Sequence, residues 1–265
     1  MGGNQGPQKG VKPQDGASTK VVFAGFKDST ILQEAGDISS SDSAYWWLNS
    51  GGLFLVDGGI GKTVQGELST KSNWYKLYLA TNPRDTDNGV HPQNIFRLVN
   101  RNKYLNFRQE MYFKIVRDHL SASEFRNESN GVLFFNRYAD GNNLYYAGIR
   151  VDGYAVVKKK IDGTYYQMAL EKVFDGPPYD LVKSPDILPK NVFMGLRTEV
   201  RNIAGGKVNV KVFMDIRGNG HWKQIISVDD EDGKYGGPVL RAADHAGIRT
   251  DFMDVEFKNY KIEEL

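Results

Sequence analysis

Three Asp-Gly dipeptides between residues 131 and 168 constrain the fold more than any other feature of this sequence. They are Asp140-Gly141, Asp152-Gly153 and Asp162-Gly163, and each separates two runs of alternating apolar and polar residues. Asp-Gly favours tight hairpin turns because both residues tolerate positive φ. We therefore predict an antiparallel meander whose strands cover residues 131–138, 144–151, 154–161 and 164–168.

The segment 103–115 shows the same two-residue period, with one apolar and one polar face. Side chains at a period of two point to opposite faces of a strand. The apolar face comprises Leu105, Phe107, Met111, Phe113 and Ile115, and the polar face comprises Asn106, Arg108, Glu110, Tyr112 and Lys114. The first set can seal a core, and the second is unusually rich in charge and tyrosine.

Composition extends the β prediction to most of the chain. With 29 Gly and 12% aromatic residues, the sequence suits short strands joined by tight turns. Further strands are predicted at 21–26, 44–48, 52–56, 74–79, 95–99, 191–200, 207–216, 222–228, 245–250 and 253–262, with no helix of any length. We expect a flexible leader at residues 1–18 and one all-β domain at residues 19–265.

Charge and residue usage exclude several classes of function. The formal net charge is +2, from 34 basic and 32 acidic residues, so neither nucleic acid nor an anionic membrane is expected as partner. No apolar run reaches the roughly 20 residues of a membrane span, so membrane insertion is not expected. The absence of cysteine excludes disulfides and thiolate chemistry. The four His lack the spacing of zinc ligands.

Two segments resemble the concanavalin A-like lectin/glucanase superfamily, which includes laminin-G-like domains. They are Gly131-Val-Leu-Phe-Phe-Asn-Arg-Tyr-Ala-Asp-Gly-Asn-Asn-Leu-Tyr-Tyr146 and Ala246-Gly-Ile-Arg-Thr-Asp-Phe-Met-Asp-Val-Glu-Phe-Lys-Asn-Tyr-Lys-Ile262. The resemblance implies a β-sandwich, a jelly-roll of two curved antiparallel sheets. Because the superfamily contains lectins, glycosidases, lyases and adhesion modules, it implies carbohydrate recognition without choosing among them.

The polar faces of several predicted strands would form a basic, tyrosine-lined groove if they converge. Arg and Lys suit carboxylates, and Tyr can stack on sugar rings. The proposed substrate-binding residues are Arg108, Glu110, Lys114, Gln93, Arg97, Asn136, Arg150, Lys158, Arg197 and Glu199. The alternative is that these side chains form cross-strand salt bridges on a solvated outer sheet.

A uronic-acid polymer matches such a groove, and Arg108-Gln-Glu-Met-Tyr112 is similar in part to the Arg-x-Glu-x-Arg strand motif of jelly-roll alginate lyases. Tyr112 replaces the final Arg, and the Gln-Ile-His or Gln-Val-His element of those enzymes is missing. Lyase chemistry needs a group that removes a proton beside the carboxylate. The candidates are Tyr112, Tyr146 and His91. The Glu-x-Asp-x-x-Glu motif of the superfamily's glucanases is absent, which argues against a glycosidase.

The prediction is a protein that recognises an acidic polysaccharide and cleaves it by β-elimination. The alternatives are a non-catalytic carbohydrate-binding or adhesion module and a structural surface or assembly protein. No cofactor is required, although the oxygen-rich loops 215–220 and 229–233 suit either a structural calcium ion or simple turns. An acidic polysaccharide partner implies an extracellular or cell-surface location.

Overall fold

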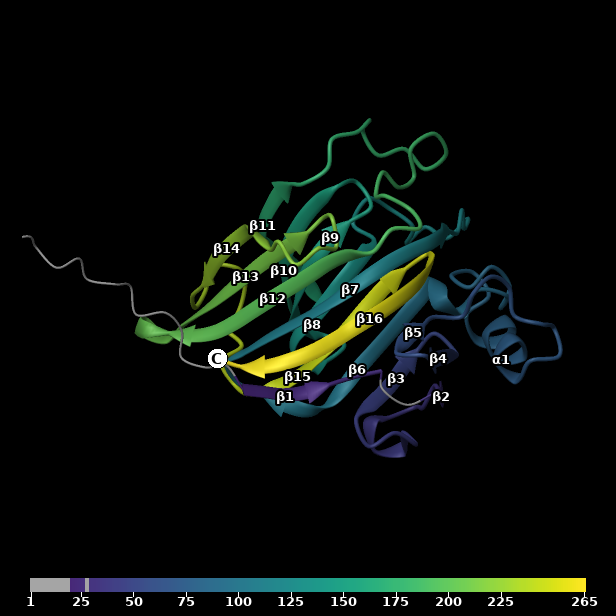
Figure 1. The fold of residues 1–265 in the computed structure, drawn as a ribbon, viewed down its shortest axis with the longest axis horizontal. Helices are drawn as coiled ribbons and strands as arrows, with labels where there is room; N and C mark the ends of the chain where they lie inside the picture. The colour runs from purple at the N-terminus through teal and green to yellow at the C-terminus, as the bar shows by residue number, and fades with distance from the viewer. Residues whose placement is uncertain (1–19, 27–28) are drawn as a thin grey trace, which may run out of the picture.

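The protein is a sandwich of two antiparallel β-sheets, as the sequence predicts (Figure 1). The structure, a computed structural model, describes residues 20–26 and 29–265, so the predicted leader at residues 1–18 lies outside the described residues. Every pairing between named strands is antiparallel. The two sheets are called sheet A and sheet B below.

Sheet A contains nine strands in the order β14-β13-β12-β7-β16-β5-β4-β2, with β1 paired to β16. Their bounds are β1 Lys20–Ala24, β2 Thr30–Gln33, β4 Leu53–Asp57, β5 Ile60–Lys62, β7 Phe107–Asp118, β12 Met194–Ile203, β13 Lys207–Asp215, β14 Lys223–Asp230 and β16 Met253–Glu264.

Sheet B contains seven strands in the order β11-β10-β9-β8-β15-β6-β3. Their bounds are β3 Trp46–Ser50, β6 Ile95–Tyr104, β8 Gly131–Asp140, β9 Asn143–Arg150, β10 Tyr154–Ile161, β11 Thr164–Lys172 and β15 Asp244–Asp251. Strands β8 to β11 form the meander predicted from the three Asp-Gly dipeptides, with each strand paired to the next.

The core lies between the sheets and follows the alternation read from the sequence. On β7, Phe107, Met111 and Phe113 are fully buried, and on β9, Tyr145 and Ala147 are fully buried from the opposite side. Burying each large apolar side chain contributes about 1.5–3 kcal/mol, so this layer accounts for much of the driving force for folding. The outward-facing residues of both sheets are then free for other roles.

Leu105 does not belong to the core, although the alternation assigned it there. Strand β6 ends at Tyr104 and β7 begins at Phe107, so Leu105 and Asn106 form the turn between them. Leu105 is 44% exposed as a result. The predicted two-residue alternation therefore holds within β7 but not in the turn before it.

The prediction of a strand at 74–79 is wrong, because Asn73–Thr81 forms the helix α1, at the right edge of Figure 1. Ser72 caps it, since its side chain accepts a hydrogen bond from the backbone N of Trp74. Tyr78, one turn after Trp74, donates a hydrogen bond to Glu34 Oε2 at 2.5 Å. This contact between Tyr78 and Glu34, the residue after β2, therefore favours a helix over the predicted strand.

In the part of the chain that the structure describes, three short 3₁₀ helices lie at Ile38–Ser40, Pro92–Asn94 and Ala204–Gly206. Strands β11 and β12 are joined by a long loop, residues 173–193, which lies at the top of Figure 1. Within residues 20–26 and 29–265, no helix has the length and apolar character that crossing a membrane requires.

Candidate functional site

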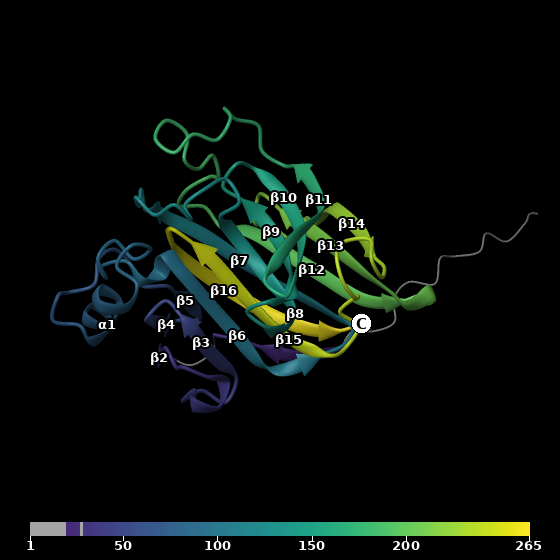
Figure 2. The same cartoon turned by 180° about the vertical axis from the view of Figure 1, so that it is seen from behind.

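The best candidate for a binding site is the outer face of sheet B, the face directed away from the core. On β9 and β10, Tyr145, Val157 and Lys159 point inward, so their neighbours Tyr146 and Lys158 point outward. The face has a floor of its own, a second apolar cluster composed of Val99, Leu133, Phe135, Tyr138, Leu144, Tyr146 and Val156. Figure 2 shows the molecule from the side opposite to Figure 1.

A cavity of about 340 Å³ opens on this face. Its walls come from β8, β9, β10, β11, β15 and the loop before β8, and they comprise Phe125, Asn127, Ser129, Asn130, Leu133, Tyr146, Lys158, Tyr165 and Arg249. Ligand pockets in proteins typically start at about 300 Å³, so this cavity lies within their size range.

Arg249 and two tyrosines form the polar centre of this cavity. The guanidinium carbon of Arg249 lies 5.1 Å from the ring centre of Tyr146, and the ring centres of Tyr146 and Tyr165 are 5.7 Å apart. The Nε of Arg249 donates to Asp251 Oδ1 at 2.9 Å, which orients the guanidinium. The guanidinium and the two phenols thus form one polar cluster on the cavity wall.

The environment drives the pKa values of the two phenols apart. Burial raises the pKa of Tyr146 to about 12, so it stays protonated at neutral pH. Burial also tends to raise the pKa of Tyr165, but the charge of Arg249 and hydrogen bonds with Tyr146 and Arg249 outweigh it and bring the pKa to about 8. Pairs of titratable groups whose pKa values diverge are typical of acid and base roles.

Two further cations, both predicted from the sequence as binding residues, lie on the same face. Lys158 lines the cavity, and burial together with Arg150 and Arg249 lowers its pKa. Arg97 on β6 is the cross-strand partner of Arg249 on β15. Of the predicted residues, the structure thus brings Tyr146, Lys158 and Arg97 to one face.

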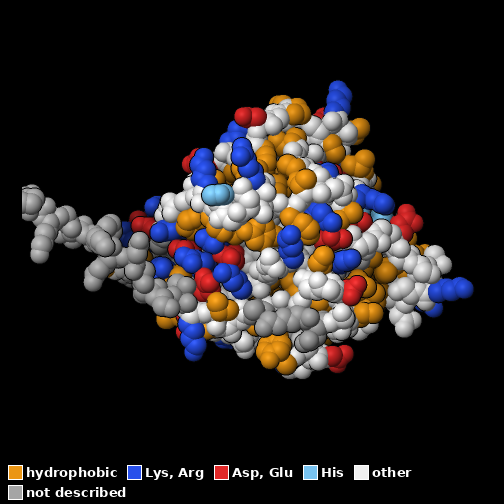
Figure 3. Space-filling model, in the orientation of Figure 1, with side chains coloured by type: hydrophobic (Ala, Val, Ile, Leu, Met, Phe, Trp, Pro, Cys, Tyr) orange, Lys and Arg blue, Asp and Glu red, His pale blue; other side chains and the backbone are white. Residues whose placement is uncertain are grey.

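Six of the other predicted members lie on the opposite side of the molecule, on the outer face of sheet A: Arg108, Glu110, Tyr112, Lys114, Arg197 and Glu199. Arg108 pairs with Glu199 at 2.6 Å and with Glu263 at 3.1 Å, and Arg197 donates to Glu110 at 2.6 Å. Figure 3 shows acidic and basic side chains interspersed over this face, near the C-terminal end of β16. This geometry matches the alternative interpretation, in which these side chains form cross-strand salt bridges on an outer sheet. The residues on sheet A and those on sheet B therefore do not line one common groove.

Tyr112 and Lys114 also belong to the sheet A face. The hydroxyl of Tyr112 donates to Asp215 Oδ2 at 3.3 Å, and burial followed by the charge of Asp215 raises its pKa. Lys114 pairs with Glu256 at 2.6 Å. A phenol with a raised pKa beside a carboxylate is a poor base, so this geometry does not favour the predicted role of Tyr112 in proton removal.

Asn136 and Arg150 are held by the protein itself. Asn136 is fully buried between the sheets, where its Oδ1 accepts from Gln109 Nε2 and Thr198 Oγ1. Arg150 donates hydrogen bonds from Nη2 to Asp152 Oδ2, at 2.6 Å, and from Nε to the carbonyl of Glu128. Neither side chain lines the 340 Å³ cavity.

His91 and Gln93 lie at one end of the sandwich in a network of their own. The imidazoles of His91 and His119 stack with ring centres 4.1 Å apart, and His91 Nδ1 contacts Asp87 Oδ2 at 2.8 Å. Gln93 is fully buried and donates to Asp254 Oδ1. These contacts tie the loop before β6 to β16, and they leave His91 outside the cavity.

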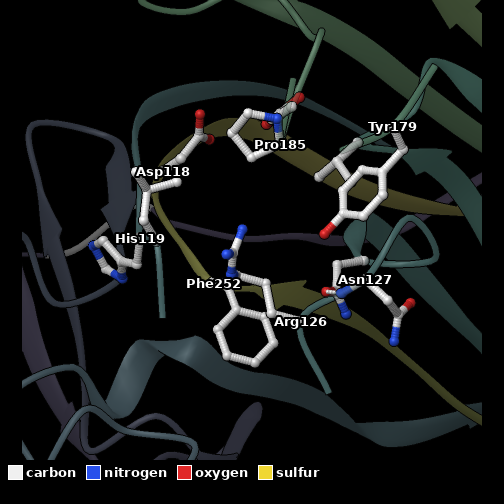
Figure 4. A pocket seen from close by; sticks show the side chains of 11 residues that line it. Asp118, His119, Arg126, Asn127, Tyr179, Pro185 and Phe252 are labelled. Carbon is white, nitrogen blue, oxygen red and sulfur yellow. Dashed lines mark hydrogen bonds between the residues drawn. The ribbon is translucent and has the colours of Figure 1, made fainter. Parts of the chain in front are cut away.

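A second hollow beside this network is too small for a ligand (Figure 4). It measures about 20 Å³, enough for about one water molecule. Its walls include Asp118, His119, Tyr179 and Asp186. Asn127 and Asn130 line both this hollow and the 340 Å³ cavity, so the two are neighbours.

Comparison with known proteins identifies the fold. No protein-family model and no curated protein sequence matches this chain. Among solved structures, the carbohydrate-binding module CBM66 from Bacillus subtilis is 14% identical and aligns over 83% of this chain and 95% of its own, with a TM-score of 0.50. The fold is that of the concanavalin A-like lectins and glucanases. The resemblance read from the sequence is therefore confirmed for the fold.

Two further solved structures align with lower scores. A protein of unknown function with a galectin-like fold from Bacillus subtilis is 13% identical over 93% of this chain and 98% of its own, with a TM-score of 0.46. A β-glucanase from Bacillus licheniformis is 9% identical over 90% of this chain and 99% of its own, with a TM-score of 0.44.

The loops considered for calcium are occupied by contacts within the protein. Asp215 Oδ2 accepts from the backbone N of Gly220, and Asp232 pairs with Arg241 at 2.7 Å. Across the described part of the chain, no three His, Asp or Glu side chains gather as a metal site. These contacts fit the turn-forming alternative, and we propose no calcium site there.

Tyr165, Arg249 and Phe125 are site residues that the sequence reading missed. Arg249 lies in a segment that carries the family resemblance, and Tyr165 lies two residues after the third Asp-Gly dipeptide. The strand period places both on the face of Tyr146 and Lys158 once the register of the meander is known. The pairing of β8 with β15, which are more than 100 residues apart, is the information that the sequence pattern lacks.

Proposed function

We propose that the outer face of sheet B binds a carbohydrate, and that this carbohydrate is an acidic polysaccharide. The observation that carries the proposal is the 340 Å³ cavity in which Arg249 and Lys158 converge with Tyr146 and Tyr165. Cations recognise the carboxylates of a uronic acid, and the phenol rings offer stacking surfaces for sugar rings. The fold supports the proposal, because one similar structure is that of a carbohydrate-binding module. An extracellular or cell-surface location suits such a ligand.

The tyrosine pair supports a second, more specific proposal, cleavage by β-elimination. The Tyr165 phenolate would remove the proton next to the uronate carboxylate, while Arg249 stabilises the negative charge that develops on that carboxylate. A carbon–carbon double bond then forms as the bond to the leaving glycosidic oxygen breaks. Tyr146, whose pKa is about 12, would return a proton to that oxygen. No oxidant or cofactor is needed.

One experiment separates the proposals. The protein is titrated with alginate, polyglucuronate, pectate and a neutral glucan, and the absorbance of the unsaturated product is followed in parallel. Binding to the acidic polymers with a rise in absorbance supports a lyase, and binding without a rise supports a carbohydrate-binding module. Equal affinity for the neutral glucan would contradict the acidic specificity. No affinity for any polymer, together with ordered self-association, would instead indicate an assembly protein.

The variant Lys158→Gln tests where the polymer binds. It removes one cation from the cavity and should weaken binding by about tenfold, since a hydrogen bond to a charged group contributes about 1.5–3 kcal/mol. Lys114→Gln is the matched control, because Lys114 occupies the outer face of sheet A. A loss of binding in the control alone would move the site to sheet A.

A further inference from the structure

Arg137 on β8 is a fully buried arginine with no carboxylate among its hydrogen-bond partners. It is 1% exposed, and its guanidinium donates to three neutral oxygens, Asn202 Oδ1 at 2.7 Å, the Leu240 carbonyl at 2.7 Å and the Leu105 carbonyl at 2.6 Å. A guanidinium has five N–H donors. Among the residues that the structure describes, the Nε–H has no partner, and Nη2 makes a single hydrogen bond.

The acidic groups near Arg137 are already paired with other cations. Asp230 contacts Lys159 at 3.0 Å and accepts from the hydroxyl of Tyr145. Asp244 contacts Lys103 at 2.8 Å. A buried charge normally has a counter-ion because leaving water is costly. Burial accordingly lowers the pKa of Arg137 to about 10.

Arg137 lines a cavity of about 330 Å³, separate from the one on the sheet B face. Its described walls comprise Arg137, Ala139, Val239, Leu240, Arg241, Ala242 and Asp244. Arg241 pairs with Asp232 at 2.7 Å, so Arg137 is the cation of this lining, as far as the structure describes it, that has no carboxylate partner. The other walls are the apolar side chains of Ala139, Val239, Leu240 and Ala242, together with Asp244, which is paired with Lys103.

The backbone at Arg137 is in an unusual conformation. Its φ is +51°, in the left-handed region, and the pairing of β8 with β9 shifts register between Asn136 and Asp140. For a long side chain this conformation costs on the order of 1 kcal/mol. Backbone strain of this kind concentrates at functional sites, and here it coincides with the uncompensated charge.

We propose that this cavity binds a small organic carboxylate, which supplies the counter-ion that Arg137 lacks. One carboxylate balances the one uncompensated positive charge, whereas a phosphate dianion would bring an excess negative charge next to Asp244. The apolar walls suit the carbon body of such an acid. Because protein covers Nε, the carboxylate reaches it only when the segment 239–242 shifts, and this segment lies outside the strands.

The test uses acetate, butanoate, glucuronate and phosphate at constant ionic strength, with chloride as reference, and measures binding by calorimetry. Ala242→Phe fills the cavity without touching the hydrogen bonds of Arg137, and its site is exposed. Ala243→Phe is the matched control, since Ala243 is also exposed but does not line the cavity. If Ala242→Phe does not fold, Ala139→Phe fills the same cavity from β8.

We expect saturable carboxylate binding by the native chain and by Ala243→Phe, and binding at least about tenfold weaker in Ala242→Phe, as for the loss of a charge-assisted hydrogen bond. Stronger binding of butanoate than of acetate would support the role of the apolar walls. The proposal is overturned if no carboxylate binds more tightly than chloride, or if phosphate binds more tightly than every carboxylate. It is also overturned if Ala242→Phe and its control Ala243→Phe bind carboxylate with equal affinity. Polysaccharide binding on sheet B should be the same in all these variants.

Discussion

The guanidinium of Arg249 lies over the ring of Tyr146, with its central carbon 5.1 Å from the ring centre. Asp251 accepts the Nε–H of the same arginine. A face-on ring, a carboxylate and a hydrogen bond with Tyr165 together fix the side chain on the wall of the sheet B cavity. The opposite face of the molecule carries a similar arrangement, because Arg197 lies 4.1 Å from the ring centre of Trp222 and pairs with Glu110.

These two arginines allow a matched test of which face binds the polysaccharide. Arg249→Lys keeps the charge but loses the planar donor fork, so affinity for alginate or polyglucuronate should fall by about tenfold. Arg197→Lys makes the same change on sheet A and should leave affinity unaltered. Affinities are measured by calorimetry at fixed salt. Equal losses in both variants would mean that the effect is not local to the cavity.

Tyr165 should ionise well before an ordinary tyrosine. Its pKa of about 8 predicts that raising the pH from 7 to 9 produces about one phenolate per chain, visible as a change in tyrosine absorbance. The variant Tyr165→Phe should lack this step, and Tyr45→Phe, at a site that is 57% exposed, should keep it. If the chain is a lyase, its rate rises over the same pH range. An absorbance step that survives in Tyr165→Phe would assign the low pKa to another residue.

Asp186 should make stability depend on pH. It belongs to the loop 173–193, where Lys190 Nζ contacts Asp186 at 2.8 Å and Asp118 at 3.1 Å. Burial and the charge of Asp118 raise the pKa of Asp186 from 3.8 to about 7. Folding therefore retains a proton that the unfolded chain has lost, and the stabilisation is full below about pH 4 and disappears as the pH rises through about 7.

The variant Asp186→Asn cannot ionise, so the decline in stability between pH 4 and pH 7 should be shallower by roughly 1–3 kcal/mol. Urea unfolding at several pH values measures it. Asp175→Asn is the control in the same loop, because the Asp175 side chain is 97% exposed. Parallel stability curves for the native chain and Asp186→Asn would show that the carboxyl pair does not hold the extra proton.

The ion pairs on sheet A should stabilise the fold without binding sugar. Arg108→Ala leaves Glu199 and Glu263, both mostly buried, without their shared cation, and should cost roughly 1–3 kcal/mol. A double-mutant cycle with Glu199→Gln should give a coupling near 1 kcal/mol that decreases with salt. Polysaccharide affinity serves as the second measurement. If Arg108→Ala lost affinity for the polysaccharide while its stability was unchanged, the sugar site would lie on sheet A instead.

The sequence by itself determined most of the strands and the faces of those strands, although it did not indicate β2 and β5. Asp-Gly dipeptides set the meander β8–β11, and the two-residue period separates inward Phe107 from outward Arg108 and inward Tyr145 from outward Tyr146. These are local properties, because turn chemistry and side-chain alternation depend on neighbours in the chain. Local signals failed at α1, where Tyr78 meets Glu34, a residue more than 40 positions away.

Only the tertiary structure decided which outward faces share a side of the molecule. Alternation places Arg108 and Lys158 outward on their own strands, but it does not reveal that β7 belongs to sheet A and β10 to sheet B. Sheet membership is fixed by pairings between distant strands, such as β8 with β15 and β7 with β16. For that reason Arg249 joins Tyr146 and Tyr165 in one cavity, while Arg108 is matched with glutamates on the far side of the core.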